Sequence, residues 1–212
     1  MNLNQSVRTH ETARGEQPPL IMSLLKAETA TAHRQLERTN SFIRLFSPDY
    51  AMPEYKQLLC LFYGFHAALE PMLFDDLAEA HQLVLGHKVK TGLLARDIAT
   101  FGETEAEIAK IRRCAELPQL SSFARQMGAF YVLEGSVLGG RIISKQLKEH
   151  FGDAIVDKLN YYTCYGENVG FEWKSFQAFM GSQFADDSNQ IPEVIAAAND
   201  TFMALYQWFN RA

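Results

Sequence analysis

The stretch YVLEGSVLGGRIISKQL, residues 131–147, decides the fold, because it lies in an apolar helical pattern from about Ser121 to His150. It holds Gly135, Gly139 and Gly140. Each glycine in a helix interior costs about 1 kcal/mol relative to alanine, so we expect a helix that the glycines interrupt and bend. Gly135 and Gly139 share a face, which therefore presents almost bare backbone. The spacing fits either a tightly packed neighbouring helix or a broad, flat ligand, and leaves both open.

Helical periodicity extends from this segment in both directions, whereas strand patterns are short and few. A helix is expected to open at Met52–Pro53–Glu54, with Pro71 as a kink or break. Thr104 and Glu107 form a capping box that starts another helix. A polar segment covers residues 81–90 and an aromatic-rich loop covers 161–170. The remaining helices are expected near 21–39, 91–99, 104–114, 153–160, 172–182 and 191–210.

The length of 212 residues and the composition, 47% hydrophobic and 21% charged, suit one globular domain. We expect a flexible N-terminal tail over residues 1–19, ending at Pro18–Pro19, and one all-α helical domain over 20–212. No internal repeat or second domain is indicated.

Charge and cysteine content exclude several classes of protein. The formal net charge of −5, without a basic cluster, argues against a nucleic-acid surface. Cys60, Cys114 and Cys164 are odd in number and show no CxxC spacing, which is typical of a reducing compartment. The polar N-terminus is no secretion signal, and no apolar run is long enough for a membrane span. The sequence therefore predicts a cytoplasmic protein.

The segment KAETATAHRQLERTN, residues 26–40, offers a candidate metal ligand in His33, with Glu37 one turn later. A neutral imidazole is a good ligand for haem iron, and a nearby carboxylate can orient it. Lys26 and Thr29 lie on the same side of that helix and suit the propionates at the edge of a flat ligand. A lone helical histidine is more often a surface or core residue, so this segment alone leaves both interpretations open.

The remaining histidines and motifs indicate no further metal, catalytic or nucleotide site. His66 is interpreted as a core or edge residue of its apolar helix, and the remaining histidines lie in polar stretches. No HExxH or His/Cys cluster indicates zinc. No GxSxG elbow or Walker-type loop indicates a hydrolase or a nucleotide site.

Taken together, the two segments resemble the haem oxygenase family, particularly its bacterial members associated with phytochromes. Lys26-x-x-Thr29-x-x-x-His33-x-x-x-Glu37 is similar to the family's proximal helix, and residues 131–140 are similar to its kinked distal helix. The resemblance implies a helical bundle with haem between these helices and His33 as the axial iron ligand. It assigns catalytic roles to Ser136, Gly135 and Gly139. The haem contacts it implies are Lys26, Thr29, Glu37, Phe130, Gly140 and Lys174.

Two positions depart from the family pattern. Many members carry an aspartate beside the first distal glycine, where this chain has Ser136, whose hydroxyl can also hold a water network. Mammalian-type members use an arginine for a propionate where this chain has Ala178, with Lys174 nearby as a substitute. Because propionate anchoring fixes which meso carbon is attacked, the regiochemistry stays open.

The resemblance implies oxidative opening of haem to biliverdin, ferrous iron and carbon monoxide. Haem is then both substrate and cofactor, O2 is consumed, and a ferredoxin or flavoprotein reductase supplies electrons. An acidic donor would dock near Lys26, Arg34 and Lys174. A bacteriophytochrome is a possible recipient of the pigment. One alternative is a non-catalytic haem carrier, store or sensor. Another is a related helical enzyme such as a thiamin-degrading hydrolase, which would need a nucleophilic cysteine with a base partner.

Overall fold

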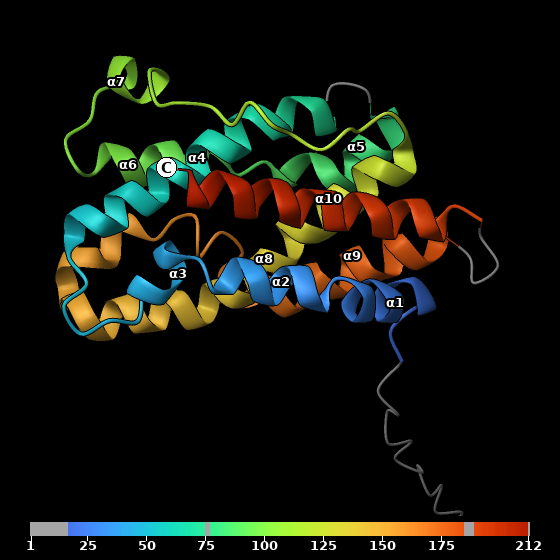
Figure 1. Ribbon diagram of the computed structural model, residues 1–212, viewed down its shortest axis with the longest axis horizontal. Helices are drawn as coiled ribbons and strands as arrows, with labels where there is room; N and C mark the ends of the chain where they lie inside the picture. Colours follow the sequence, from blue (N-terminus) through green and yellow to red (C-terminus); the bar gives the residue numbers. More distant parts are fainter. Residues whose placement is uncertain (1–16, 75–76, 185–188, 212) are drawn as a thin grey trace, which may run out of the picture.

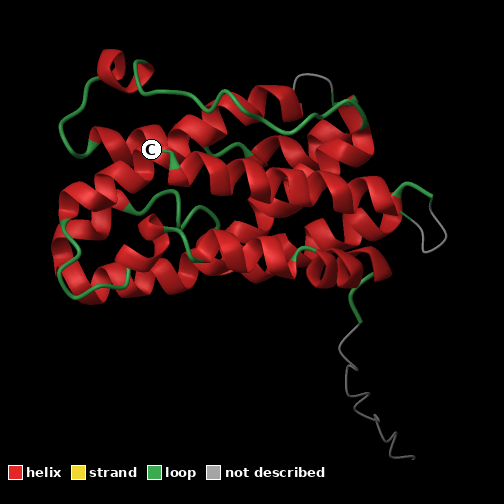
Figure 2. Cartoon of the chain, in the orientation of Figure 1, coloured by secondary structure: helices red, strands yellow, loops and turns green. Residues whose placement is uncertain are grey.

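A computed structural model describes residues 17–74, 77–184 and 189–211. Most of the expected tail, residues 1–16, lies outside this range, and residues 17–19 form a loop into the first helix. The described part contains helices and loops and no strand, as Figure 2 shows. The α-helices are α1 Leu20–Glu28, α2 Ala30–Glu37, α3 Asn40–Arg44, α4 Met52–Phe74, α5 Glu79–Leu85, α6 Thr91–Ala99, α7 Glu105–Ala109, α8 Phe123–Phe151, α9 Val169–Gln183 and α10 Ile191–Asn210. The residues that the structure describes also form the 3-10 helices η1 Gly86–Lys88, η2 Gly152–Lys158 and η3 Gly166–Asn168.

The long helix α10 is the centre of the arrangement, because it packs against α8, α2, α1 and α4. In Figure 1 it crosses the front of the molecule, with α4, α5 and α6 above it and α1, α2 and α3 along the lower edge. Helix α9 packs against both α8 and α1. The N-terminal segment and the glycine-containing helix thus belong to one bundle joined through α10.

The expected first helix is present with one change. It divides at Thr29 into α1 and α2. The Thr29 hydroxyl donates to the Leu25 carbonyl oxygen at 2.7 Å, a local bond that competes with regular helix geometry. The backbone N–H of His33 still donates to the Thr29 carbonyl oxygen at 2.9 Å, so α2 follows α1 closely.

Several other boundaries follow the sequence pattern. Thr104 and Glu107 form the expected capping box, with the Thr104 N–H donating to the Glu107 carboxylate at 2.8 Å. The helix that follows ends at Ala109, earlier than expected. The segment 81–90, expected to be irregular, contains most of α5 and all of η1. Pro71 lies inside α4, which continues to Phe74, so the proline marks the last turn.

Helix α8 is continuous through all of its glycines, so the expected interruption of the helical pattern is wrong. Its N-cap is Ser122, whose side-chain oxygen accepts a hydrogen bond from the Arg125 N–H at 3.2 Å. It extends to Phe151, where Gly152 takes a positive φ of 59° and ends the helix.

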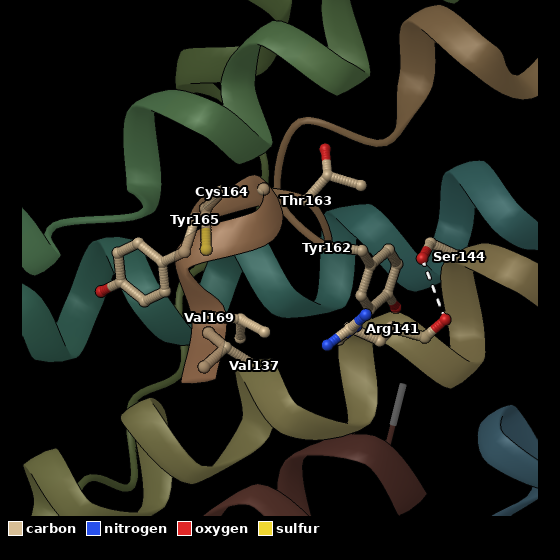
Figure 3. Close-up of a pocket in the computed structure, with 9 residues that line it drawn as sticks. Val137, Arg141, Ser144, Tyr162, Thr163, Cys164, Tyr165 and Val169 are labelled. Carbon is tan, nitrogen blue, oxygen red and sulfur yellow. Dashed lines mark hydrogen bonds between the residues drawn. The ribbon is translucent and has the colours of Figure 1, made fainter. Parts of the chain in front are cut away.

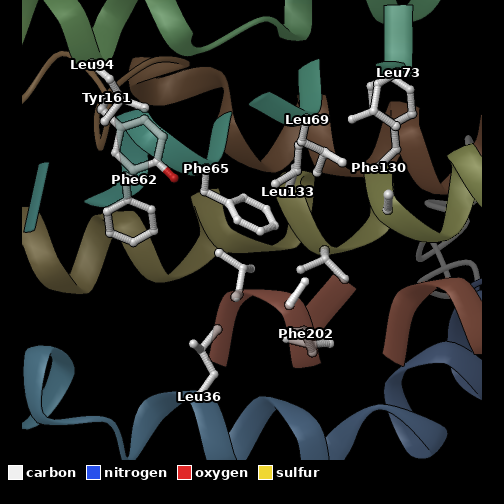
Figure 4. Close-up of a cluster of buried hydrophobic side chains, with 14 of the residues drawn as sticks. Leu36, Phe62, Phe65, Leu69, Leu73, Leu94, Phe130, Leu133, Tyr161 and Phe202 are labelled. Carbon is white, nitrogen blue, oxygen red and sulfur yellow. The ribbon is translucent and has the colours of Figure 1, made fainter. Parts of the chain in front are cut away.

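The core lies between α4, α8 and α10, as Figure 4 shows. Phe62 of α4 is central to it. Its ring lies 5.2 Å from that of Tyr161 and 5.1 Å from that of Phe209, centroid to centroid. Leu36 of α2 points toward this cluster from below in Figure 4. By length and composition α4 could cross a membrane, with a mean hydropathy of 1.2 over the best window, but it packs here as a core helix.

A buried ionic cluster joins the loop before α6 to α8. The Lys90 ammonium donates to the Glu134 carboxylate, and Lys88 lies 3.2 Å from the other oxygen of the same carboxylate. All three side chains are 2% exposed. The Tyr165 hydroxyl donates to Glu134 at 3.0 Å. Burial raises the pKa of Tyr165, and the negative charge of Glu134 raises it further. Glu134 thereby fixes the rotation of α8 just before Gly135.

Candidate functional site

His33 lies on the outer part of α2, with 54% of its side chain exposed. Its Nδ1 is 3.4 Å from Oε2 of Glu37, the carboxylate expected to orient it. Its ring meets the ring of Phe202 of α10 edge to face, at a centroid distance of 5.6 Å. The imidazole is therefore supported on one side by Phe202 and open to solvent on another.

Tyr131 links the segment of His33 to α8 and α9. Burial raises the pKa of Tyr131, and the nearby Thr29 side chain offsets part of that rise, so the two side chains lie close together. The Tyr131 ring lies 6.1 Å from that of Trp173, centroid to centroid. Because Thr29 precedes His33 by one turn and Tyr131 precedes Gly135 by one turn, this link brings the two predicted motifs together.

The directions in which the α1–α2 segment and α8 run extend this proximity to His33 and the glycines of α8. In Figure 1 the α1–α2 segment and α8 both run from right to left. From the point where Thr29 and Tyr131 lie close together, one further turn along each segment leads to His33 and to Gly135, and a second turn of α8 leads to Gly139. The sequence pattern alone could not supply this alignment.

The face of α8 that carries Gly135 and Gly139 is open. A Cβ added at Gly139 would meet no atom of the described residues within 4 Å, and one added at Gly135 would meet only Trp173, at 3.8 Å. Leu138 and Ile142 lie beside this face and are 40% and 67% exposed. A bare backbone bordered by exposed apolar side chains suits a flat apolar ligand rather than a packed helix.

The other two glycines of α8 have a different geometry. A Cβ at Gly128 would collide with the Val194 carbonyl oxygen of α10, and one at Gly140 would approach the Tyr162 carbonyl oxygen to 2.9 Å. Close packing thus explains Gly128 and Gly140, while open space distinguishes Gly135 and Gly139. Contact between Gly140 and haem stays a prediction.

Ser136 is exposed, and its hydroxyl donates to the Leu133 carbonyl oxygen at 2.6 Å. Burial raises the pKa of Tyr161, and the nearby Ser136 side chain offsets part of that rise. The serine hydroxyl thus lies at the border between the open face of α8 and the protein interior.

The predicted cationic edge is formed by α1 and α9. Lys26 and Lys174 are both exposed. A Cβ at Gly181, near the end of α9, would contact Pro19, which comes just before α1. Trp173, near the start of α9, lies near Tyr131 and so near Thr29, which follows the end of α1. The two helices therefore run in opposite directions, and Lys174 lies at the level of the Lys26 turn.

Like Gly140, two further predicted haem contacts, Thr29 and Phe130, are buried. Thr29 is 2% exposed and its hydroxyl donates to the Leu25 carbonyl oxygen. Phe130 is 1% exposed and packs edge to face on Phe74, with ring centroids 5.1 Å apart. Both side chains hold the helices that frame the site, and their direct contact with haem stays a prediction.

A small cavity of about 190 Å³ lies beside α8 and the loop of residues 162–166 (Figure 3). Val137, Arg141 and Ser144 line it from α8. By helical spacing these residues lie on the side of α8 opposite Gly135 and Gly139. The cavity is therefore separate from the open face.

Sequence reasoning missed Tyr131, Trp173, Leu138 and Ile142 as parts of this site. Tyr131 and Ile142 are spaced by one and two turns from Gly135, a signal that the sequence did contain. Trp173 comes from a separate helix and had no such signal.

Comparison with known proteins identifies relatives along nearly the whole chain. A family model described as Heme oxygenase matches residues 21–211. A curated relative named Heme oxygenase, from Xanthomonas campestris pv. campestris, is 28% identical over 127 residues, which are 59% of this chain and 71% of that relative.

Two solved structures share the arrangement of helices. Heme oxygenase from Leptospira interrogans has a TM-score of 0.69 at 16% identity, over 91% of this chain and 99% of that one. Heme oxygenase-1 from the cyanobacterium Synechocystis, solved in complex with heme, has a TM-score of 0.67 at 16% identity, over 90% and 91%. At these identities the likeness establishes the all-α fold.

Proposed function

Because the chain belongs to the haem oxygenase family, we propose that it opens haem to biliverdin, ferrous iron and carbon monoxide, using O2 and electrons from an external donor. One observation carries the proposal. The Tyr131 hydroxyl of α8 lies near Thr29, which comes one turn before His33, and this proximity aligns the exposed His33 with the open face at Gly135 and Gly139. An imidazole on one side and bare backbone on the other suit a flat metal-containing substrate.

Each residue of the site then has a physical task. His33 binds the iron through Nε2 while Glu37 orients the ring through Nδ1. The edge contact with Phe202 limits rotation of the imidazole. Haem supplies the redox-active iron and is itself the molecule that is cleaved, so the protein contributes mainly position and protons.

On the other side of the substrate, the absence of side chains on Gly135 and Gly139 lets the backbone approach closely. Exposed Leu138 and Ile142 cover the apolar ring and exclude water. Ser136 holds a hydroxyl at the border of this face, where it can order a proton-donating water. Lys26 and Lys174 attract the two propionates. Their position fixes which edge of the macrocycle lies near Ser136.

Electrons come from a ferredoxin or a flavoprotein reductase in this proposal. Lys26, Arg34 and Lys174 are exposed on neighbouring helices and would contact an acidic donor. The free thiols of Cys60, Cys114 and Cys164 support a cytoplasmic location. We further assign the biliverdin to a bacteriophytochrome as chromophore, which co-expression with an apo-phytochrome would test through the appearance of a photochromic absorption band.

The second candidate function is a haem carrier or sensor without turnover. Ser136 favours it, because a serine replaces the aspartate that many family members carry beside the first distal glycine. Such a protein would bind haem through the same His33 and the same open face. The two functions differ in the fate of the bound substrate.

Spectroscopy with haemin separates these functions. Haemin is added to the purified protein, the Soret band is recorded, and ascorbate is then supplied in the presence of catalase. The proposal requires a histidine-ligated spectrum that decays to that of biliverdin. A stable spectrum supports the carrier, and failure to bind haemin contradicts both functions.

His33→Ala is the decisive variant, with His87→Ala as its matched control. Both side chains are about half exposed and lie beside a glutamate, His33 next to Glu37 and His87 3.0 Å from Glu172. The first variant should lose the histidine-ligated spectrum and the second should keep it. Survival of that spectrum in His33→Ala overturns the ligand assignment.

A further inference from the structure

The buried ionic cluster of Lys88, Lys90 and Glu134 extends to a fourth charged residue, Glu172, near the start of α9. Nζ of Lys88 lies 3.2 Å from a carboxylate oxygen of Glu134 on α8, and it donates a hydrogen bond of 3.2 Å to Oε2 of Glu172. The Lys88 side chain is 2% exposed and that of Glu172 is 21% exposed. Glu134, Lys88 and Glu172 thus form a lysine bridge between α8 and α9.

Among the described residues, the charges of the cluster balance when Glu172 is included. Lys88 and Lys90 carry two positive charges, and Glu134 supplies one negative charge to both. A buried charge without a partner of opposite sign is costly, so the second ammonium requires a second carboxylate. Burial raises the pKa of Glu172, but its hydrogen bonds with His87 and Lys88 outweigh burial and the net pKa is lowered. The carboxylate on α9 is therefore ionised, as this pairing needs.

Tyr165 encloses the bridge on a further side. The ammonium groups of Lys88 and Lys90 lie over its ring, 5.1 and 5.5 Å from the centroid, and its hydroxyl donates to Glu134 at 3.0 Å. A cation is attracted to the face of an aromatic ring. Two carboxylates and one ring therefore fix the position of the Lys88 ammonium.

Both carboxylates of the lysine bridge come directly before a residue of the candidate site. Glu134 precedes Gly135, and Glu172 precedes Trp173. The Trp173 ring borders the open face of α8, since a Cβ added at Gly135 would meet it at 3.8 Å. Lys174, the predicted propionate contact, follows on α9. The bridge therefore joins the two helices at the level where α9 borders the open face.

From this geometry we infer that Lys88 is a positioning residue for the reaction, because it fixes Trp173 and Lys174 relative to the open face of α8. The width of the space beside Gly135 and the place of the propionate contact then depend on one buried ammonium that touches no substrate. The inference rests on the proposed function, since it concerns the same site. A cluster that served stability alone would, when weakened, lower the free energy of unfolding and leave the geometry of the face unchanged.

Lys88→Met and Glu172→Gln break the bridge from its centre and from α9. Lys88→Met removes the ammonium and keeps an unbranched side chain, while Glu134 retains its pairing with Lys90 and Glu172 retains its contact with His87. Glu172→Gln keeps the size of the side chain and removes its charge. Each variant leaves the rest of the cluster with partners, so we expect both to fold.

Glu103→Gln is the matched control for Glu172→Gln. Glu103 is 28% exposed and forms an ion pair with Lys56 of α4, so it resembles Glu172 in exposure and in its lysine partner. Neither residue of this pair belongs to α8 or α9. Thermal unfolding of each haem-free variant establishes that it folds, and if one bridge variant does not fold, the other decides the test.

The first measurement needs no haem and uses the indole N–H resonances of the two tryptophans, Trp173 and Trp208. In ¹⁵N-labelled protein, Trp173→Phe identifies the resonance of Trp173. This resonance should move in Lys88→Met and Glu172→Gln and stay in place in Glu103→Gln, while that of the buried Trp208 should stay in place throughout. An unmoved Trp173 resonance in the bridge variants, or an equal movement in the control, overturns the inference.

The second measurement uses the complex with haemin and separates the biliverdin isomers by chromatography. Both bridge variants should bind haemin with a wild-type Soret band, convert it about tenfold more slowly, and change the ratio of isomers, because the substrate is held in a different orientation. Glu103→Gln should keep the wild-type rate and ratio. An unchanged ratio in Lys88→Met and Glu172→Gln overturns the inference, whatever their rates. If the wild type itself fails to bind or convert haem, the proposed function fails, and the Trp173 resonance still decides whether the bridge positions α9.

Discussion

The rings of His33 and Phe202 meet edge to face, with centroids 5.6 Å apart and planes inclined at 75°. This contact joins α2 to α10, and it restrains an otherwise exposed imidazole. Phe202 is 6% exposed, so the contact is backed by the core. The restraint on the predicted iron ligand therefore comes from a residue 169 positions later in the chain.

Phe202→Leu should weaken haemin binding severalfold, because the imidazole of His33 loses its aromatic support. The fold should remain, since a hydrophobic exchange of similar volume costs roughly 1.5 kcal/mol or less. Phe209→Leu is the control, because Phe209 lies in the same helix and contacts Phe42 and Phe62 instead. Haemin titration and thermal unfolding measure both effects. Equal affinities in the two variants would contradict the role of Phe202.

Gly139→Ala should stabilise the haem-free protein by up to about 1 kcal/mol, because alanine favours a helix interior. The added Cβ meets no atom of the described residues within 4 Å. It would lie on the open face, however, and should weaken haemin binding. Gly92→Ala in α6 also adds a Cβ in open space and should leave haemin binding unchanged. Stabilisation without any loss of affinity would show that haem does not approach Gly139.

Gly128→Ala should have the opposite effect on stability. Its Cβ would collide with the Val194 carbonyl oxygen and come within 2.8 Å of Ala197 Cβ. Overpacking of this kind typically costs about 1–3 kcal/mol, and the obstacle here is partly backbone, which yields little. Denaturant unfolding measures the loss. The folded fraction should bind haemin as the wild type does, because Gly128 serves the contact between α8 and α10.

Glu134→Gln should destabilise the protein strongly. It leaves the buried ammonium groups of Lys88 and Lys90 without the carboxylate that they share. Removal of one partner from a buried ion pair typically costs about 3–5 kcal/mol. Glu149→Gln is the control, since Glu149 pairs with Lys145 on the surface and should change the free energy of unfolding little. A small effect of Glu134→Gln would indicate that water reaches the cluster.

Glu70 should make stability depend on pH in the acid range. Burial raises the pKa of its carboxyl group, but hydrogen bonds with His66 and Thr91 outweigh burial, so the pKa in the folded protein lies below the ordinary value of 4.5. The unfolded chain therefore binds the proton first as pH falls, and the folded state loses this stabilisation. The contribution is fully present above pH 4.5 and is lost as the pH falls through the lowered pKa. Glu70→Gln should flatten this part of a plot of unfolding free energy against pH. An unchanged slope would contradict the lowered pKa.

Much of the fold follows from local signals in the sequence. The apolar periodicity of residues 121–150 predicted α8, and the Thr104–Glu107 capping box predicted the start of α7. These features depend on residues one or two turns apart, which interact within a single helix. The same signals could not show that α8 stays continuous through its glycines, because packing against α10 overrides their low helix propensity.

The candidate site likewise combines features that the sequence predicts with features that only the tertiary structure determines. The sequence by itself placed His33 with Glu37, and Gly135 with Gly139, because each pair lies one helical turn apart. Only the tertiary structure decided which glycines are open and which are packed, since that depends on the distant backbone of Val194 and Tyr162. It also decided that His66, which the sequence indicated only as a core or edge residue, connects Glu70 to Tyr161. Contacts between distant segments form when helices bury their apolar faces together, and no local pattern encodes their register.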